Sequence, residues 1–200
     1  MGNKLVMGVG VNNEEYPATE CSKQVKEYDY WLGMIRRCAK RTWKTNPSYT
    51  GTTCSENFKN YSFFYEWCQQ QVGFGRVDEK GKCWQLDKDI LIKGNKTYSE
   101  DVCVFVPQRL NSLLLRREAS RGAHLVGVYW LKNRSKFMAQ CANKSGKQIY
   151  LGVFDDEIRA FQAYKSFKEA YIKEVASEYK IQIDERVYQA LMDYRVEITD

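Results

Sequence analysis

The sequence predicts an α+β protein: a helical first half that ends in a β-hairpin and a helix, then a sheet of three antiparallel strands packed on a helix. Three observations predict this fold. Residues 26–41 repeat apolar side chains at helical spacing, residues 83–106 contain two strand-like runs around a Gly-Asn turn, and residues 127–154 contain three short strand-like runs separated by turn sequences.

Composition places the chain among soluble globular proteins. Its 200 residues are 44% hydrophobic and 28% charged, with a net charge of +6. No apolar run approaches the ~20 residues that span a membrane, and no long apolar segment of a signal peptide opens the chain. We therefore expect a cytoplasmic protein without a membrane partner, in the host cell if the protein is viral.

The numbers and spacing of the cysteine and histidine residues argue against a fold held together by a structural metal site or by disulfide bonds. The seven cysteines are odd in number and lack C-x-x-C spacing, and His124 is the only histidine. Cys38, Cys54 and Cys103 could converge in space, but we interpret them as small buried hydrophobic residues rather than zinc ligands. We interpret His124 as an ordinary linker residue.

The first half is expected to begin with an irregular arm, residues 1–25. Its "GVGVNN" has two glycines of a dinucleotide fingerprint but no third, so no nucleotide or organic cofactor is expected. A helix over residues 26–41 would bury one apolar stripe, made of Trp31, Met34, Ile35 and Cys38. A second helix is expected from Ser55, a good N-cap, to Gln71, with most of its aromatic side chains in the core.

A hairpin and a short helix should complete the first half. Strands are expected near residues 83–91 and 102–106, joined through the turn "KGNK" at 93–96. Pro107 ends the second strand, and residues 108–117 can form a helix. The polar, small-residue segment 118–126 is a candidate linker.

The second half is predicted as a meander followed by helices. Its strands are "GVYWL" (127–131), "KFMAQCA" (136–142) and "KQIYLGVF" (within 147–154), separated by the turns "KNRS" and "NKSG". A helix should follow from residue 155 to about 178, capped by Asp155 or Asp156. Its apolar stripe is expected in the core: Ala160, Ala163, Tyr164, Phe167, Tyr171 and Val175. A last helical piece is expected at residues 184–194.

The distribution of charge points to a polyanionic partner. Residues 121–152 contain six basic residues and no acidic one, whereas residues 153–200 contain seven basic and eleven acidic residues. A concentrated positive stretch is the electrostatic footprint of nucleic-acid binding. One sheet face should cover the helix, and the other could present basic and aromatic side chains to the DNA major groove.

The second half resembles the plant ethylene-response-factor (Apetala-two type) DNA-binding domain. The resemblance is carried by "GVYWLKNRSKFMAQC" and "KQIYLGVFDDEIRAFQAYKSF", which match its G-V-x-W, W/F-x-A and L-G-x-F-D-x-x-E patterns. It implies that the sheet meets double-stranded DNA. The candidate DNA-binding residues are Tyr129, Trp130, Lys132, Arg134, Lys136, Gln140, Lys144, Lys147 and Tyr150. Lysine at several of these positions favours phosphate contact over base reading.

The hairpin "LDKDILIKGNKTYSEDVCVFVPQRLN" resembles that of phage-type HNH (His-Asn-His) homing endonucleases, in which such a DNA-binding domain commonly follows a ββα-metal nuclease domain. The resemblance implies that Asp87 and Asn111 hold Mg or Mn, that Asn95 is the central asparagine, and that Lys88 stands where the family has its catalytic histidine. The implied domains are an arm (1–25), an HNH-like domain (26–117), a linker (118–126) and a DNA-binding domain with a C-terminal helix (127–200).

Lys88 leaves alternatives open for the hairpin. A lysine is ordinarily protonated near neutral pH and is a poor proton acceptor, so Lys88 would act as a phosphate clamp or an ion-pair partner. Strand alternation would put Asp87 and Asp89 on one face, so that both could join Asn111 in a metal site whose bound hydroxide replaces the base. These residues could also be simple strand and turn residues.

Three functions follow from these patterns. The first is a metal-dependent endonuclease or nickase that uses Asp87, Lys88, Asn95 and Asn111. The second is a DNA-binding regulator on the same scaffold without cleavage. The third is an inhibitor that binds a host protein. Intact Asp87 and Asn111 favour the first, and Lys88 favours the second.

Overall fold

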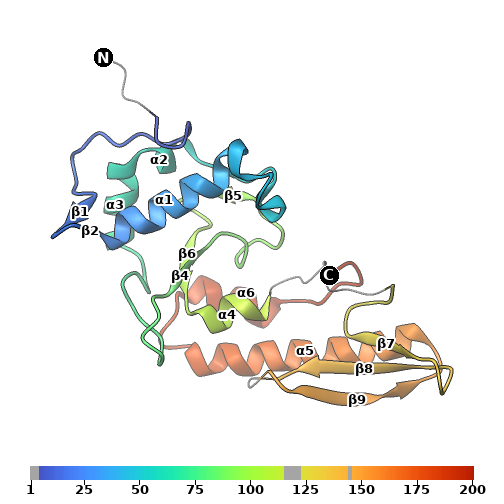
Figure 1. The fold of residues 1–200 in the computed structure, drawn as a ribbon. Coiled ribbons are helices and arrows are strands. Elements are labelled where there is room, and N and C mark those ends of the chain that lie inside the picture. Colours follow the sequence, from blue (N-terminus) through green and yellow to red (C-terminus); the bar gives the residue numbers. More distant parts are fainter. Residues whose placement is uncertain (1–4, 115–122, 144–145) are drawn as a thin grey trace. The chain divides into compact units, whose positions relative to one another are not determined.

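The computed structural model describes residues 5–114, 123–143 and 146–200, and the chain divides into two compact units (Figure 1). The first unit comprises residues 1–111 together with 181–187. The second comprises residues 112–180 together with 188–200. Both units mix helices and strands, so the expected α+β class is confirmed at that level.

The first unit is mainly helical, with three two-stranded pairings. Its strands pair as β1–β2 (antiparallel), β3–β5 (parallel) and β4–β6 (antiparallel). In chain order its elements are β1 (Thr19–Glu20), β2 (Lys23–Gln24), α1 (Lys26–Cys38), η1 (Lys40–Thr42), η2 (Pro47–Tyr49), β3 (Thr53–Cys54), α2 (Glu56–Lys59), α3 (Tyr61–Gln69), β4 (Gln85–Asp87), β5 (Thr97–Tyr98), β6 (Val104–Val106) and α4 (Gln108–Leu113).

The core of the first unit is aromatic. The predicted stripe of α1 is buried as expected, and the indole N–H of Trp31 donates to the carbonyl of Phe58 at 2.9 Å. Phe58 packs on the Trp67 ring, with centroids 4.9 Å apart, and Trp67 in turn packs on Phe105 of β6. The β4–β6 pair is therefore anchored to the helices through Phe105, which fixes the position of the hairpin.

The single helix predicted for residues 55–71 is wrong, because the chain breaks into α2 and α3 at Asn60. The arm causes part of this break. The amide of Val11 donates to the carbonyl of Lys59 at 2.8 Å, and the amide of Tyr61 donates to the carbonyl of Val11 at 3.0 Å. These contacts satisfy backbone groups that a continuous helix would have bonded internally.

The hairpin is shorter than predicted. β4 stops at Asp87, so the strand expected over residues 83–91 is too long and Asp89 lies beyond it. β4 and β6 pair with Leu86 opposite Phe105, and α4 follows β6 directly. The helix expected over 108–117 ends at Leu113, and residues 115–117 lie outside the described residues.

The second unit confirms the predicted meander. β7 (Val128–Leu131), β8 (Lys136–Ala142) and β9 (Gln148–Phe154) form one antiparallel sheet in the order β7–β8–β9. α5 (Glu157–Tyr179) follows, and the Asp156 side chain caps it by accepting from the Arg159 amide at 2.8 Å. α6 (Glu185–Asp193) corresponds to the last predicted helix.

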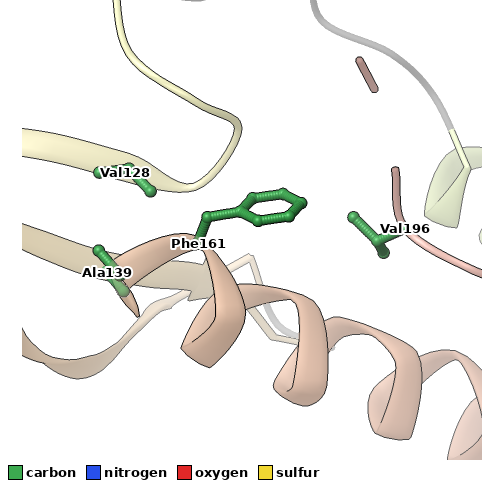
Figure 2. Close-up of a cluster of buried hydrophobic side chains, with 5 residues drawn as sticks. Val128, Ala139, Phe161 and Val196 are labelled. Atoms are coloured by element: carbon green, nitrogen blue, oxygen red, sulfur yellow. The ribbon is translucent and has the colours of Figure 1, made fainter. Parts of the chain in front are cut away.

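A small apolar cluster joins the sheet to α5 (Figure 2). It consists of the buried Val128 and Ala139 from the sheet, Ala160 and Phe161 from α5, and Val196 from the C-terminal segment. Gly127 has a φ of +75°, and a Cβ built there would lie 2.0 Å from the Tyr164 ring. Only glycine allows this approach, so the "GV" that opens the meander is a packing requirement. No helix in the described part of the chain is long and apolar enough to cross a membrane.

Candidate functional sites

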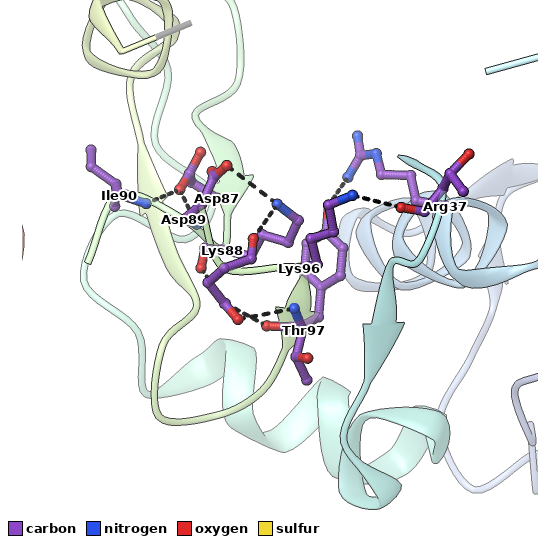
Figure 3. Close-up of polar contacts among 10 residues, drawn as sticks. Arg37, Asp87, Lys88, Asp89, Ile90, Lys96 and Thr97 are labelled. Atoms are coloured by element: carbon purple, nitrogen blue, oxygen red, sulfur yellow. Dashed lines mark hydrogen bonds and ion pairs between the residues drawn. The ribbon is translucent and has the colours of Figure 1, made fainter. Parts of the chain in front are cut away.

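Asp87 closes β4 by binding the backbone that follows it (Figure 3). Its Oδ1 accepts hydrogen bonds from the amides of Asp89, at 2.9 Å, and Ile90, at 2.7 Å. This local capping offers the backbone an alternative to the sheet ladder, which explains why the strand ends here. The expected sharing of one strand face by Asp87 and Asp89 is therefore wrong, because the chain has already turned at Asp89.

The environment of Asp87 disfavours its ionised form. The residue is only 7% exposed. Burial, followed by the nearby Asp89 carboxylate, raises the pKa of Asp87 from 3.8 to about 6, against the opposing effects of the two amides and Lys88. Carboxylates with pKa values raised in this way are common at functional sites.

Lys88 and Asn95 hold the loop between β4 and β5 closed. The Lys88 ammonium donates to the Asn95 carbonyl at 2.8 Å and lies 3.3 Å from Asp89 Oδ2. In return, the Asn95 side-chain amide donates to the carbonyls of Lys88, at 2.7 Å, and Thr97, at 2.8 Å, and its Oδ1 accepts from the Thr97 amide. Lys88 also lies over the Tyr98 ring. These contacts bind the Lys88 side chain to the loop backbone and give Asn95 a role in shaping the loop.

Asn111 is tied to the strand that carries Asp87. From α4, its side-chain amide donates to Gln85 Oε1 at 2.7 Å. Gln85 and Asp87 are two positions apart on β4 and so share a strand face. Gln85 was missed by the sequence reasoning, although its i, i+2 spacing from Asp87 could have singled it out.

No group of three or more His, Cys, Asp or Glu side chains suited to a metal ion forms within residues 5–114, 123–143 and 146–200. A site built from Asp87, Asp89 and Asn111 would include one amide ligand.

Cys38 and Cys54 interact through a thiol hydrogen bond that raises the pKa of Cys38 and lowers that of Cys54. Burial raises the pKa of Cys103. Cys38 and Cys103 are buried and Cys54 is half-buried.

The sheet of the second unit has one face toward α5 and one open face. Ala139 is buried in the cluster with α5, so the alternate positions along β8, Met138 and Gln140, lie on the other face. Their strand partners lie there too: Tyr129 and Val153 beside Met138, and Tyr150 beside Gln140. We call this the outer face. Tyr129 is 46% exposed and Tyr150 63%. Sequence reasoning missed Met138, which strand alternation from Gln140 assigns to this face, and Val153, which lies there beside Tyr150 because of the register shift between β8 and β9.

Trp130 does not join the outer face, contrary to expectation. It is the strand neighbour of Tyr129 and therefore points the opposite way. It pairs with Phe137, the ring centroids being 4.7 Å apart, at the edge of the side that α5 covers. Its 39% exposure leaves one edge accessible.

The predicted basic residues lie at the two ends of β8. Lys136 begins the strand on the outer face and forms a 2.9 Å ion pair with Asp155. Lys132 and Arg134 are exposed in the turn between β7 and β8. Lys147 lies at the other end, where its amide donates to Asn143 Oδ1. Lys144 lies outside the described residues.

His124 packs against the α5 side of the same unit. Its Nδ1 lies 3.3 Å from Glu157 Oε1, and its ring contacts Phe137 edge-on. Glu157 also accepts from the amide of Leu125. Glu157 therefore fastens the segment that leads into β7 onto the first turn of α5.

Comparison with known proteins gives no relative to which the chain can be assigned. No protein-family model, no curated protein and no solved structure matches it. The two sites are therefore interpreted from their own geometry.

Proposed function

We propose that the protein binds double-stranded DNA through the outer face of β7–β8–β9. The observation that carries the proposal is the arrangement of this face. Two exposed tyrosines and Gln140 occupy its centre, and basic residues lie at both ends of β8. Side chains that can contact base edges are thus flanked by side chains that can contact phosphates.

The dimensions suit the major groove. β8 spans seven residues, which at a rise of about 3.4 Å per residue separates its first and last Cα atoms by roughly 20 Å. The groove is roughly 12 Å wide. The middle of the strand can therefore face the base edges while Lys136 and Lys147 reach phosphates on opposite sides. The exposed ion pair with Asp155 restrains Lys136 weakly, because such pairs contribute little in water.

A salt titration of DNA affinity tests the proposal. A variant with Lys132, Arg134 and Lys147 changed to glutamine is compared with wild type on duplexes selected from a random pool. If the three residues contact phosphates, the slope of log affinity against log salt should shrink by roughly 2 to 3.

The matched control removes three positive charges from α5 and the residue that follows it: Arg159, Lys173 and Lys180 changed to glutamine. It should leave most of the slope intact. Equal slopes for the two variants, or no measurable DNA affinity in wild type, would refute the proposal. The second outcome would leave the host-protein inhibitor as the surviving function.

A second candidate function is metal-dependent cleavage of DNA. Two observations favour it. The paired strands β4 and β6 are followed by the helix α4, as in a ββα arrangement, and a hydrogen bond joins Asn111 of α4 to Gln85, two positions before Asp87 on β4. Asp87 and Asn111 offer oxygen ligands, which suit Mg or Mn, whereas the Asp89 carboxylate is paired with Lys88. Such an ion would polarise the scissile phosphate when bound. The contacts of Lys88 with Asn95 and Asp89 give this side chain a structural role, so this chain offers no evident general base at that position.

Nicking of supercoiled plasmid in the presence of Mg or Mn separates cleavage from binding alone. Asp87→Asn is the test variant. Asp78→Asn is its control, because Asp78 Oδ1 also caps two backbone amides, those of Lys80 and Lys82 at 2.9 Å, at an exposed turn. Cleavage requires nicking by wild type and by the control but not by the test variant. DNA binding without nicking would leave the non-catalytic regulator.

A further inference from the structure

The first unit contains a second segment rich in positive charge. Residues 30–55 include five arginine and lysine residues and no aspartate or glutamate. Asp29 and Glu56 border this segment, so the absence of acidic residues ends abruptly on both sides. Protein surfaces usually intersperse both signs of charge, and a stretch of 26 residues with one sign requires an explanation.

The structure displays four of these five cations together at one end of α1. Arg36 lies in the last turn of α1, Lys40 and Arg41 lie in η1, and Lys44 follows. All four side chains are exposed. In the described part of the chain, none of them takes part in an ion pair. We call these four residues the α1 basic patch.

Arg37, the fifth cation, has a structural role. It is half-buried, with its guanidinium 5.6 Å from the centroid of the Tyr49 ring and hydrogen-bonded to the Tyr98 hydroxyl at 3.3 Å. It fixes the segment after α1 against β5. The patch is therefore a set of solvated charges on an anchored backbone rather than part of the core.

Helix stabilisation accounts for only one member of the patch. Positive charge near a helix C-terminus interacts favourably with the helix dipole, but the effect fades beyond the last turn. Arg36 satisfies that condition, whereas Lys40, Arg41 and Lys44 lie after α1 has ended. Four exposed cations within nine residues repel one another unless an anion neutralises them.

We propose that the α1 basic patch binds the phosphate backbone of duplex DNA, at a site of the first unit that is distinct from the sheet of the second. Guanidinium and ammonium groups pair with phosphate oxygens through charge-assisted hydrogen bonds. Such contacts read no sequence. The patch therefore contributes affinity for any duplex and leaves the choice of sequence unaffected.

The test uses the full chain and a short duplex of random sequence. Arg36, Lys40, Arg41 and Lys44 are changed together to glutamine, which keeps the helix propensity of α1. The control variant removes four exposed lysines elsewhere in the same unit: Lys23, Lys26, Lys80 and Lys82. Urea unfolding and circular dichroism establish that both variants are folded.

If the patch contacts phosphates, its variant should lower the slope of log affinity against log salt by about 3 to 4, because each phosphate contact contributes about 0.9. The control should lower it by less than about 1. Equal effects of the two variants would overturn the proposal, since only net charge would then matter. A competition experiment gives a second way to overturn it. If polyglutamate displaces the labelled duplex from the protein as well as unlabelled duplex DNA of equal total charge does, the patch does not prefer phosphates.

The outcome is separable from that of the function proposed for the sheet. If the sheet variant loses affinity and the patch variant does not, only the patch proposal fails. If the patch variant loses affinity and the sheet variant does not, the patch proposal stands and the sheet proposal fails.

Discussion

Replacing Asp87 by asparagine should stabilise the protein at neutral pH. The carboxyl is buried, and its pKa is raised from 3.8 to about 6. Raising the pKa from 3.8 to about 6 corresponds to about 3 kcal/mol of folding free energy, which is lost when the carboxyl ionises. Asparagine has nearly the same shape, and its Oδ1 can still accept from the amides of Asp89 and Ile90.

The pH dependence follows from the direction of the shift. Below pH about 4 Asp87 is protonated in both the folded and the unfolded chain, so its contribution to stability is fully present. Above pH about 4 the unfolded chain has lost the proton that the folded chain still holds. The contribution of Asp87 to stability therefore declines as pH rises and is lost once pH passes about 6. The free energy of unfolding of wild type should therefore fall relative to that of Asp87→Asn between pH about 4 and about 7.

Urea unfolding of both proteins across this range measures the difference. The advantage of the variant should grow by about 1 to 3 kcal/mol as pH rises, the upper end being the full shift. Asp78→Asn controls for the loss of a charged cap at an exposed turn. A pH-independent difference, or a variant that is less stable than wild type at pH about 8, would refute the reasoning. The same measurement can be repeated with Mg or Mn. If the ion binds at Asp87, it should raise the free energy of unfolding of wild type but not that of Asp87→Asn.

Two further substitutions test the loop and the second unit. Asn95→Ala removes the three hydrogen bonds that the Asn95 side chain makes within the loop. It should lower the free energy of unfolding, measured in urea, by about 3 kcal/mol. A loss below about 0.5 kcal/mol would mean that this residue does not hold the loop. Gly127→Ala places a Cβ against the Tyr164 ring at a positive φ and should cost about 3 kcal/mol or more, seen as a lower thermal midpoint; an unchanged midpoint would contradict that packing.

The sequence predicted the elements whose signals are local. The meander of the second unit was correct because each strand is short and bounded by its own turn sequence, and the cap of α5 was correct because Asp156 acts on residues directly after it. The break at Asn60 could not be predicted in the same way. It depends on Val11, which is distant in the sequence and occupies backbone groups on both sides of Asn60.

The placement of the aromatic residues on the sheet was predictable in part. Strand alternation requires that Tyr129 and Trp130 point to opposite faces, and the sequence alone could have excluded Trp130 from the outer face. The pairing of Gln140 with Tyr150 was not predictable, because it follows a register shift between Ala139 and Gln140. Such an irregularity changes which residues share a face and depends on the packing of the whole sheet.

The hairpin shows why residue identity alone could not settle its chemistry. The sequence showed that a lysine stands beside Asp87, but it could not show what the ammonium contacts. In the structure Lys88 and Asn95 exchange hydrogen bonds across the loop, each binding the backbone of the other. A proton acceptor at this position would have to give up those contacts. The geometry therefore weighs against Lys88 as a general base, and any cleavage would depend on what a metal ion at Asp87 and Asn111 supplies.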